Sequence, residues 1–167
     1  MESVRWLDER EHDCWIALLN ISMRLEGTMD SLLSKAFGLR MIEYSVLAML
    51  SESRDRTLTM GELAARTNSS PSRMSHVVKR LEGRDWVRRS PSAVDGRGTL
   101  ASLTDTGWEL IRSIAPDHVQ QVRKLIFDAL DPADLEPMLV GLTKIADQLT
   151  PPLARRSVAQ TQAELSD

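Results

Sequence analysis

Residues 58–107 read LTMGELAARTNSSPSRMSHVVKRLEGRDWVRRSPSAVDGRGTLASLTDTG, and this stretch decides the fold. Thr59 to Glu62 has the S/T-x-x-E form of a capping box, which predicts a helix beginning at Met60. Ser70-Pro71 predicts a second helix start, because a hydroxyl caps a helix and proline loses no hydrogen bond at the first helical position. The first helix is then only about two turns long, which is the dimension of a helix-turn-helix.

A charged hairpin follows the second helix. Val87 to Pro91 and Leu100 to Leu103 have the composition of two short strands, and Asp95-Gly96 between them is typical of a tight hairpin turn. A basic hairpin directly after a helix-turn-helix is a wing. The fold class predicted is mainly α with a small β-wing, with the winged helix-turn-helix over residues 42–103.

The charge of the chain is unevenly distributed. The whole chain is acidic, with 21 Lys and Arg against 24 Asp and Glu and a net charge of −3. Residues 66–97 carry eight basic and three acidic side chains, a local charge of +5 that leaves −8 for the rest. A basic patch on an acidic body is typical of a surface that binds phosphates, although a solvated helix face would give the same count.

Length and composition are those of one intracellular domain. The chain has 167 residues, 42% of them hydrophobic, and Cys14 is its one cysteine, so no intramolecular disulfide can form. The charged N-terminus lacks the apolar core of a signal peptide, and no apolar run approaches the roughly 20 residues that span a bilayer. These features predict a cytoplasmic protein.

Amphipathic helices flank the winged unit. A stripe of apolar residues predicts a first helix over residues 8–37 that ends at Gly38, and a helix over 42–52 should bury Val46, Leu47 and Leu50. Thr104 should cap a helix that extends to about Ala129 and that Pro116 kinks or interrupts, and Asp131-Pro132 should start a last helix. The first stripe consists of Trp15, Leu18, Leu25, Met29 and Leu32, and the last of Leu135, Leu139, Leu142, Ile145 and Leu149.

A core the size of a winged helix cannot cover all these apolar faces. A second copy of the chain would bury them, so residues 8–37 and 104–149 are predicted to be dimerisation helices, within one unit over residues 1–150. A monomeric bundle that folds back on its own winged helix is the alternative. Residues 151–167 are polar and are predicted to form a mobile tail.

With these elements in place, the chain resembles the MarR family of bacterial transcription regulators between about Trp15 and Leu149. The resemblance rests on the order and spacing of GELAART, SRMSHVVKRLE, WVRR, DGR and LTDTG. It departs from the family at Asp85, where glycine is usual, and at Trp86, where leucine is common. We expect Trp86 to pack under the wing and Asp85 to alter the turn.

The resemblance and the helix periodicity together predict a DNA-binding surface. Met74, Val77, Val78 and Leu81 should form the core face of the second helix. The residues expected on the DNA side are Ser70, Ser72, Arg73, Ser75, His76, Lys79, Arg80, Arg89, Asp95 and Arg97. Near the helix N-terminus Ser70, Ser72, Arg73 and His76 are placed for base edges, whereas Lys79 and Arg80 suit phosphates.

In the wing, the resemblance implies that Arg97 reaches into the minor groove and that Asp95 orients it or a neighbouring arginine. Arg88 and Arg89 alternate on a strand, so only one should face DNA, and Arg89 is favoured.

The resemblance also implies a repressor released by a small aromatic or phenolic ligand. Trp15, Met23 and Tyr44 are the residues predicted to line its site, although an apolar residue on a helical stripe is more often part of the core. Cys14 allows an alternative, a peroxide-sensing regulator. The acidic neighbours of Cys14 argue against this alternative, because a peroxide-sensing thiol must react as its anion.

Other functions fit less well. The three histidines are far apart, no nucleophile motif or phosphate-binding glycine loop occurs, and too few ligands exist for structural zinc, so no enzyme, metal or cofactor is predicted. A winged helix used only for protein contacts is the rival, yet such a module has little reason to keep Arg73, Lys79, Arg80 and Arg97 together. The partners predicted are double-stranded DNA with a pseudo-palindromic operator, a second copy of the chain, and a small-molecule effector.

Overall fold

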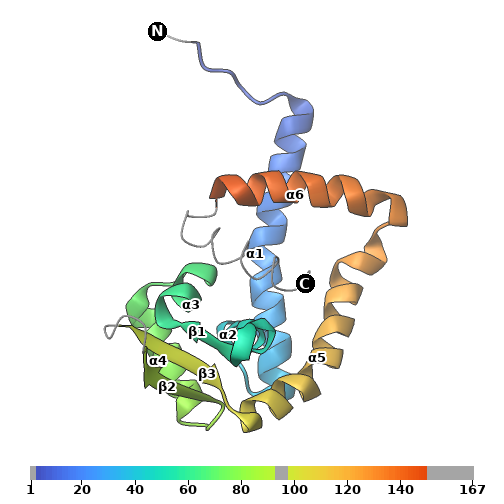
Figure 1. The fold of residues 1–167 in the computed structure, drawn as a ribbon. Coiled ribbons are helices and arrows are strands. Elements are labelled where there is room, and N and C mark those ends of the chain that lie inside the picture. The colour runs from blue at the N-terminus through green and yellow to red at the C-terminus, as the bar shows by residue number, and fades with distance from the viewer. Residues whose placement is uncertain (1–2, 93–97, 150–167) are drawn as a thin grey trace. The chain divides into compact units, whose positions relative to one another are not determined.

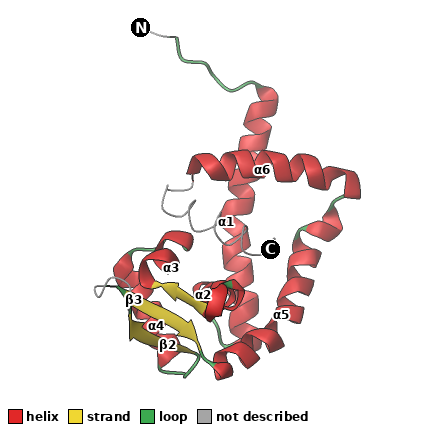
Figure 2. Cartoon of the chain, in the orientation of Figure 1, coloured by secondary structure: helices red, strands yellow, loops and turns green. Residues whose placement is uncertain are grey.

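A computed structural model describes residues 3–92 and 98–149 of the chain (Figure 1). The chain divides into two compact units, residues 1–41 and 42–167. Helices dominate, with one small sheet (Figure 2). The elements are α1 (Glu9–Phe37), α2 (Met41–Glu52), η1 (Arg54–Arg56), β1 (Thr57–Thr59), α3 (Met60–Arg66), α4 (Pro71–Glu82), β2 (Val87–Pro91), β3 (Thr99–Leu103), α5 (Asp105–Leu125), η2 (Phe127–Ala129), η3 (Pro132–Asp134) and α6 (Leu135–Leu149).

Helix α1 of the first unit begins and ends where its sequence predicts. Asp8 and Glu11 form a capping box at its N-terminus, and Gly38 ends it in the left-handed conformation at φ 64°. Met29 of the predicted stripe is buried, but Leu33 is the other buried residue of the helix, whereas the predicted Leu32 is only half-buried.

The helix-turn-helix of the second unit confirms both predicted caps. Thr59 and Glu62 form the capping box of α3, and the hydroxyl of Ser70 accepts the N–H of Arg73 at 3.2 Å at the start of α4. Asn68 turns the chain between the helices with a positive φ of 48°, which asparagine tolerates better than most residues. Local hydrogen bonds therefore set the boundaries of both helices.

The sheet has the order β1-β3-β2 and is antiparallel throughout. The predicted wing strands β2 and β3 are confirmed and pair with Arg89 opposite Ala101. Strand β1 was not predicted, because its three residues overlap the capping-box motif and are too few to show an alternating pattern. Strand β1 pairs with β3, and α3 begins directly after β1, so the start of α3 lies at the edge of the sheet (Figure 1).

The core of the second unit is aliphatic. The predicted residues Val46, Leu47 and Leu50 of α2 are buried. Other buried side chains come from α3, α4, the sheet and the first half of α5: Leu63, Met74, Val77, Val78, Leu81, Val87, Ala101, Leu103, Ile111 and Ile114. All four residues predicted for the core face of the second helix are in this set, so α4 packs against the core with the predicted face.

The C-terminal helices differ from the prediction in their limits. Pro116 was expected to kink or interrupt helix α5; the helix continues through Pro116, so the interruption does not occur. Both Pro116 and Arg112, one turn earlier, are exposed, and water can therefore take the carbonyl hydrogen bond that proline cannot make. The helix ends at Leu125, before Ala129, and the Asp131-Pro132 start forms the turn η3 ahead of α6.

Candidate nucleic-acid interface

Helix α4 presents one face to the core and the other to solvent. With Met74, Val77, Val78 and Leu81 buried, the opposite face is exposed along its whole length. The exposed residues are Pro71, Ser72, Arg73, Ser75, His76, Lys79 and Arg80. The structure thus brings six of the predicted site residues together on one helix face, with hydroxyl, imidazole and cationic groups that suit base edges and phosphates.

Ser70 has a structural use in the described chain. Its hydroxyl oxygen is the N-cap acceptor of α4, so the group predicted to read bases already holds the first turn of the helix. The residue is nevertheless exposed at the same helix end as Ser72 and Arg73.

Arg80 forms an ion pair with an acidic residue of another helix. Its Nε donates to Oε1 of Glu43 on α2 at 3.0 Å, and the side chain of Glu43 is only 6% exposed while that of Arg80 is 58% exposed. Glu43 is not among the predicted site residues. A signal was present, since Glu43 is the one charged residue of α2 before Glu52.

Arg89 of β2 is paired inside the chain. Its Nη2 and Nε donate to Oε2 of Glu82 at 2.6 and 3.0 Å, and its main-chain N–H donates to Oε1 at 3.3 Å. Hydrogen bonds from Arg89 hold the pKa of Glu82 below its ordinary value. Arg88, the less favoured of the two in the prediction, is the exposed one.

The wing is described only up to its tip. The N–H of Ser92 donates to the carbonyl of Gly98 at 2.8 Å, which extends the β2–β3 ladder past Pro91. Asp95 and Arg97, predicted at the wing tip, lie outside the described residues.

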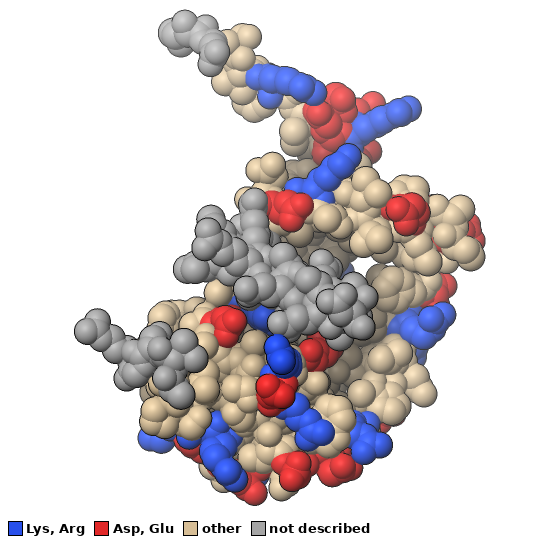
Figure 3. Space-filling view, in the orientation of Figure 1, with Lys and Arg blue, Asp and Glu red and all other residues tan. Residues whose placement is uncertain are grey.

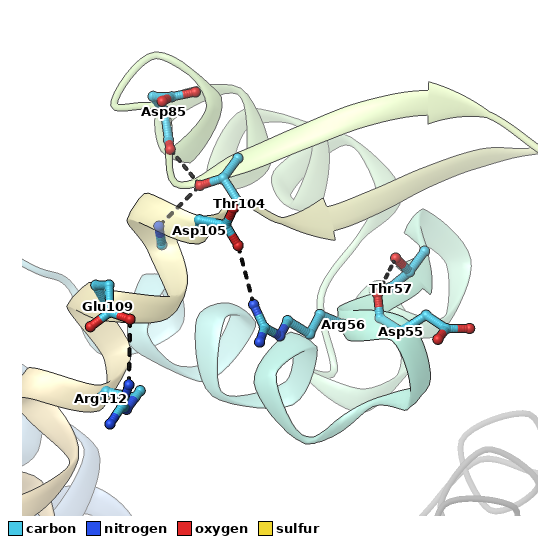
Figure 4. A network of polar contacts seen from close by, with 9 residues as sticks. Asp55, Arg56, Thr57, Asp85, Thr104, Asp105, Glu109 and Arg112 are labelled. Carbon is cyan, nitrogen blue, oxygen red and sulfur yellow. Dashed lines mark hydrogen bonds and ion pairs between the residues drawn. The ribbon is translucent and has the colours of Figure 1, made fainter.

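A second polar network joins the base of the sheet to the start of α5 (Figure 4). The hydroxyl of Thr104 donates to the main-chain oxygen of Asp85 at 2.6 Å and accepts the N–H of Gly107 at 3.0 Å. Asp85 has a positive φ of 57°, the conformation that glycine adopts without strain. Arg56 lies 4.1 Å over the ring of Trp108, and its Nη1 is 3.5 Å from Asp105.

Trp86 is half-buried, with the guanidinium of Arg84 4.8 Å above its ring. Because the N–H of Trp86 donates to the carbonyl of Leu81, the turn after α4 is tied back to that helix. The turn at Asp85 therefore connects α4, β2 and α5.

Charge on the described surface is mixed. Basic and acidic side chains are interspersed on the face drawn in Figure 3. Of the basic residues counted between 66 and 97, Arg80 and Arg89 have acidic partners, so the local charge of +5 is not a bare patch. Arg73, Lys79 and Arg88 are exposed.

The residues predicted for an effector differ in their burial. Tyr44 on α2 is buried, and its ring lies 4.2 Å from that of His118 on α5, with 37° between the planes. Burial raises the pKa of Tyr44 and lowers that of His118. Trp15 and Met23 on α1 are 48% and 80% exposed, and Cys14 is exposed with a free thiol.

No helix of the described residues is long and apolar enough to cross a membrane.

Two solved structures from Streptomyces coelicolor are similar to nearly the whole chain. The MarR family transcriptional regulator Sco3205, solved in complex with DNA, is 37% identical over 92% of this chain and 96% of its own, with a TM-score of 0.83. The MarR family transcriptional regulator AbsC is 38% identical over 87% of this chain and 98% of its own, with a TM-score of 0.80.

More distant relatives match a shorter part. The HTH-type transcriptional regulator PecS of Dickeya dadantii is 26% identical over 110 residues, which are 65% of this chain and 66% of PecS. The chain therefore covers just under two thirds of the length of PecS. A sequence model described as the MarR family matches residues 37–98.

The fold is that of a winged helix-turn-helix protein. The chain belongs to the MarR family of transcriptional regulators, as its sequence resemblance predicted. The proteins to which it is similar are transcriptional regulators.

Proposed function

We propose that the protein binds double-stranded DNA in a sequence-specific manner, with α4 as the recognition helix. The observation that carries the proposal is the division of α4 into a fully packed apolar face and an exposed polar face. A rigidly held helix with free hydroxyl and cationic groups is what major-groove reading requires. The DNA complex of the similar regulator Sco3205 supports the proposal.

Within α4, position along the helix assigns the roles. Ser72, Arg73 and His76 lie in the N-terminal half, which enters the groove in this class of domain, and Arg73 suits a bidentate contact with guanine. Lys79 and Arg80 lie in the last turn and suit phosphates. Ser75 is exposed between the two groups.

In the wing, Arg97 is proposed to contact the minor groove and Asp95 to orient it. Arg89 is assigned a different role from the one that its sequence position favoured. Because Glu82 accepts three of its N–H groups, Arg89 is proposed to hold the wing strand on α4 instead of contacting DNA directly.

The protein is also proposed to act as a homodimer. Helix α6 carries a row of apolar side chains that the described part of the chain leaves exposed: Leu135, Leu139, Leu142, Ile145 and Leu149. In α1, Trp15, Ile16 and Ile21 are exposed as well. Apolar helix faces of this size are normally covered, and a second copy would place two recognition helices on two half-sites about one helical turn apart.

A cytoplasmic repressor that a small aromatic or phenolic ligand releases is the regulatory form we propose. Tyr44 is the one predicted lining residue that is buried, and its ring lies 4.2 Å from that of His118, so two aromatic side chains lie together where such a ligand could contact them. Peroxide sensing through Cys14 is the alternative, favoured by the exposure of its thiol.

Anisotropy of the labelled DNA that flanks the protein's own coding sequence, in excess competitor DNA, tests this function. Arg73→Ala should change base preference at one position of each half-site, by roughly 1–3 kcal/mol. Arg97→Ala should weaken binding to every site and lower the salt dependence by about one counterion per chain. A uniform loss with Arg73→Ala would instead make Arg73 a phosphate contact, and unchanged affinity with Arg97→Ala would remove the wing from the interface.

A further inference from the structure

Glu43 is a buried carboxylate whose partner reaches the proposed DNA surface. It is the buried charged side chain of the described core, and it lies on α2, away from the exposed face of α4. A buried carboxylate is costly unless a charged hydrogen-bond donor compensates it. Arg80 provides such a donor through Nε at 3.0 Å.

The geometry leaves the outer part of Arg80 available. Among the described residues, the hydrogen bond of the Arg80 guanidinium to Glu43 comes from Nε and not from Nη1 or Nη2. The side chain is more than half exposed. An arginine fork bound on one edge is fixed in its plane, and its other N–H groups keep the geometry that a phosphate accepts.

Arg89 differs from Arg80 in that its acidic partner occupies most of its hydrogen-bond donors. Glu82 takes both Nε and Nη2 of Arg89 as well as its main-chain N–H, and Arg89 is correspondingly less exposed, at 32%. One carboxylate thus occupies most of Arg89, whereas Glu43 occupies one edge of Arg80.

We propose that Glu43 is a positioning residue for DNA binding: it fixes Arg80 through Nε so that the terminal nitrogens of the guanidinium meet a DNA phosphate. The proposal rests on the DNA-binding function proposed above. In this proposal Glu43 does not touch DNA and affects DNA binding through Arg80, so its effect on affinity must disappear when Arg80 is absent.

The test uses full-length protein and a fixed duplex of mixed sequence without competitor, because a phosphate contact does not depend on the operator. Affinities are measured between about 50 and 200 mM salt for the wild type, Glu43→Leu, Glu43→Gln, Arg80→Gln and the double variant Glu43→Leu/Arg80→Gln. Glu52→Gln is the matched control, since it removes an exposed acid from the same helix. Thermal unfolding checks that each variant is folded.

Arg80→Gln should weaken binding about tenfold and lower the salt dependence by about one counterion per bound chain. Glu43→Leu should reproduce both effects in the wild type and add nothing in the Arg80→Gln background. Glu43→Gln keeps an oxygen acceptor for Nε and should retain more affinity than Glu43→Leu. Glu52→Gln should not weaken binding.

Three results would overturn the proposal. Equal losses from Glu43→Leu in both backgrounds, with the salt dependence unchanged, would give Glu43 a purely structural role. Tighter binding by both Glu43 variants would mean that its charge only repels DNA. Wild-type protein that binds no duplex would reject the DNA-binding function itself, and with it the role of Glu43.

Arg80→Lys keeps the test decisive if the Glu43 variants do not fold. Lysine keeps the charge but has no planar fork to bridge a carboxylate and a phosphate. We expect weaker binding with the salt dependence preserved. Wild-type affinity in Arg80→Lys would show that no positioned fork is needed.

Discussion

Arg89 donates two hydrogen bonds to a single oxygen of Glu82, and this contact joins strand β2 to the last turn of α4. The wing and the recognition helix are consecutive in the chain, yet the turn between them contains Asp85 in a conformation that costs energy. The ion pair between Glu82 and Arg89 spans that turn and fixes the angle between α4 and β2, the two elements that are proposed to bind DNA.

A double-mutant cycle measures the coupling free energy between Glu82 and Arg89. Glu82→Gln and Arg89→Gln should each lower the free energy of unfolding, with a coupling under about 1 kcal/mol, because both side chains are about one third exposed. The pKa of Glu82 is lowered on folding, so the stabilisation is present above its ordinary pKa of 4.5 and is lost as the pH falls below it. Urea titrations at several pH values check this. A difference in unfolding free energy between the wild type and Glu82→Gln that is the same at pH 7 and in acid would contradict it.

Gly107, at the start of α5, tests the packing under the wing. A methyl group here would overlap the main-chain oxygen of Trp86 and lie 2.9 Å from the side chain of Leu103. Gly107→Ala should therefore cost about 2–3 kcal/mol in unfolding free energy by chemical denaturation. In Gly61→Ala, the control, the nearest atom is 3.8 Å away and no loss is expected. Equal stability of the two variants would contradict the packing described.

Asp85 tests the turn itself. Its φ of 57° disfavours a residue with a side chain, so Asp85→Gly should raise the unfolding free energy by about 0.5 kcal/mol or more. Asp117→Gly is the matched control, because it places glycine in the middle of α5 and should lower stability by about 0.3 kcal/mol. A loss of stability in Asp85→Gly comparable to that control would show that the aspartate side chain holds the turn.

His118 should make stability depend on pH. Because burial lowers its pKa below the ordinary 6.5, the unfolded chain takes up a proton at a higher pH than the folded chain does. Stability is therefore complete above about pH 6.5 and falls as the pH drops through that value. His118→Phe, which keeps a ring beside Tyr44, should flatten the decline in melting temperature, whereas His76→Gln, on the exposed face of α4, should not. An undiminished decline in His118→Phe would contradict the assignment.

Local signals in the sequence predicted much of the fold. The caps at Thr59, Ser70 and Thr104 depend on residues three positions apart, so their spacing alone defines the starts of α3, α4 and α5. The core face of α4 followed from helical periodicity for the same reason.

Features that depend on distant residues were not predictable in this way. Strand β1 exists only because β3 pairs with it more than forty residues later, and three residues carry no pattern of their own. Glu43 and Arg80 are 37 positions apart, so nothing in either segment indicates their pairing. The contact of Arg89 with Glu82 joins a strand to a helix, so the alternating pattern of the strand alone does not indicate it.

Selection of duplexes from a randomised library by the full-length protein, followed by the stoichiometry of the selected complex, tests the central claim most directly. We expect enrichment of a pseudo-palindrome whose half-sites lie about one helical turn apart, bound by two chains per duplex. We also expect Arg73→Ala to select a different base at one position of each half-site. A library that shows no enrichment, or a selected duplex that one chain saturates, would contradict it.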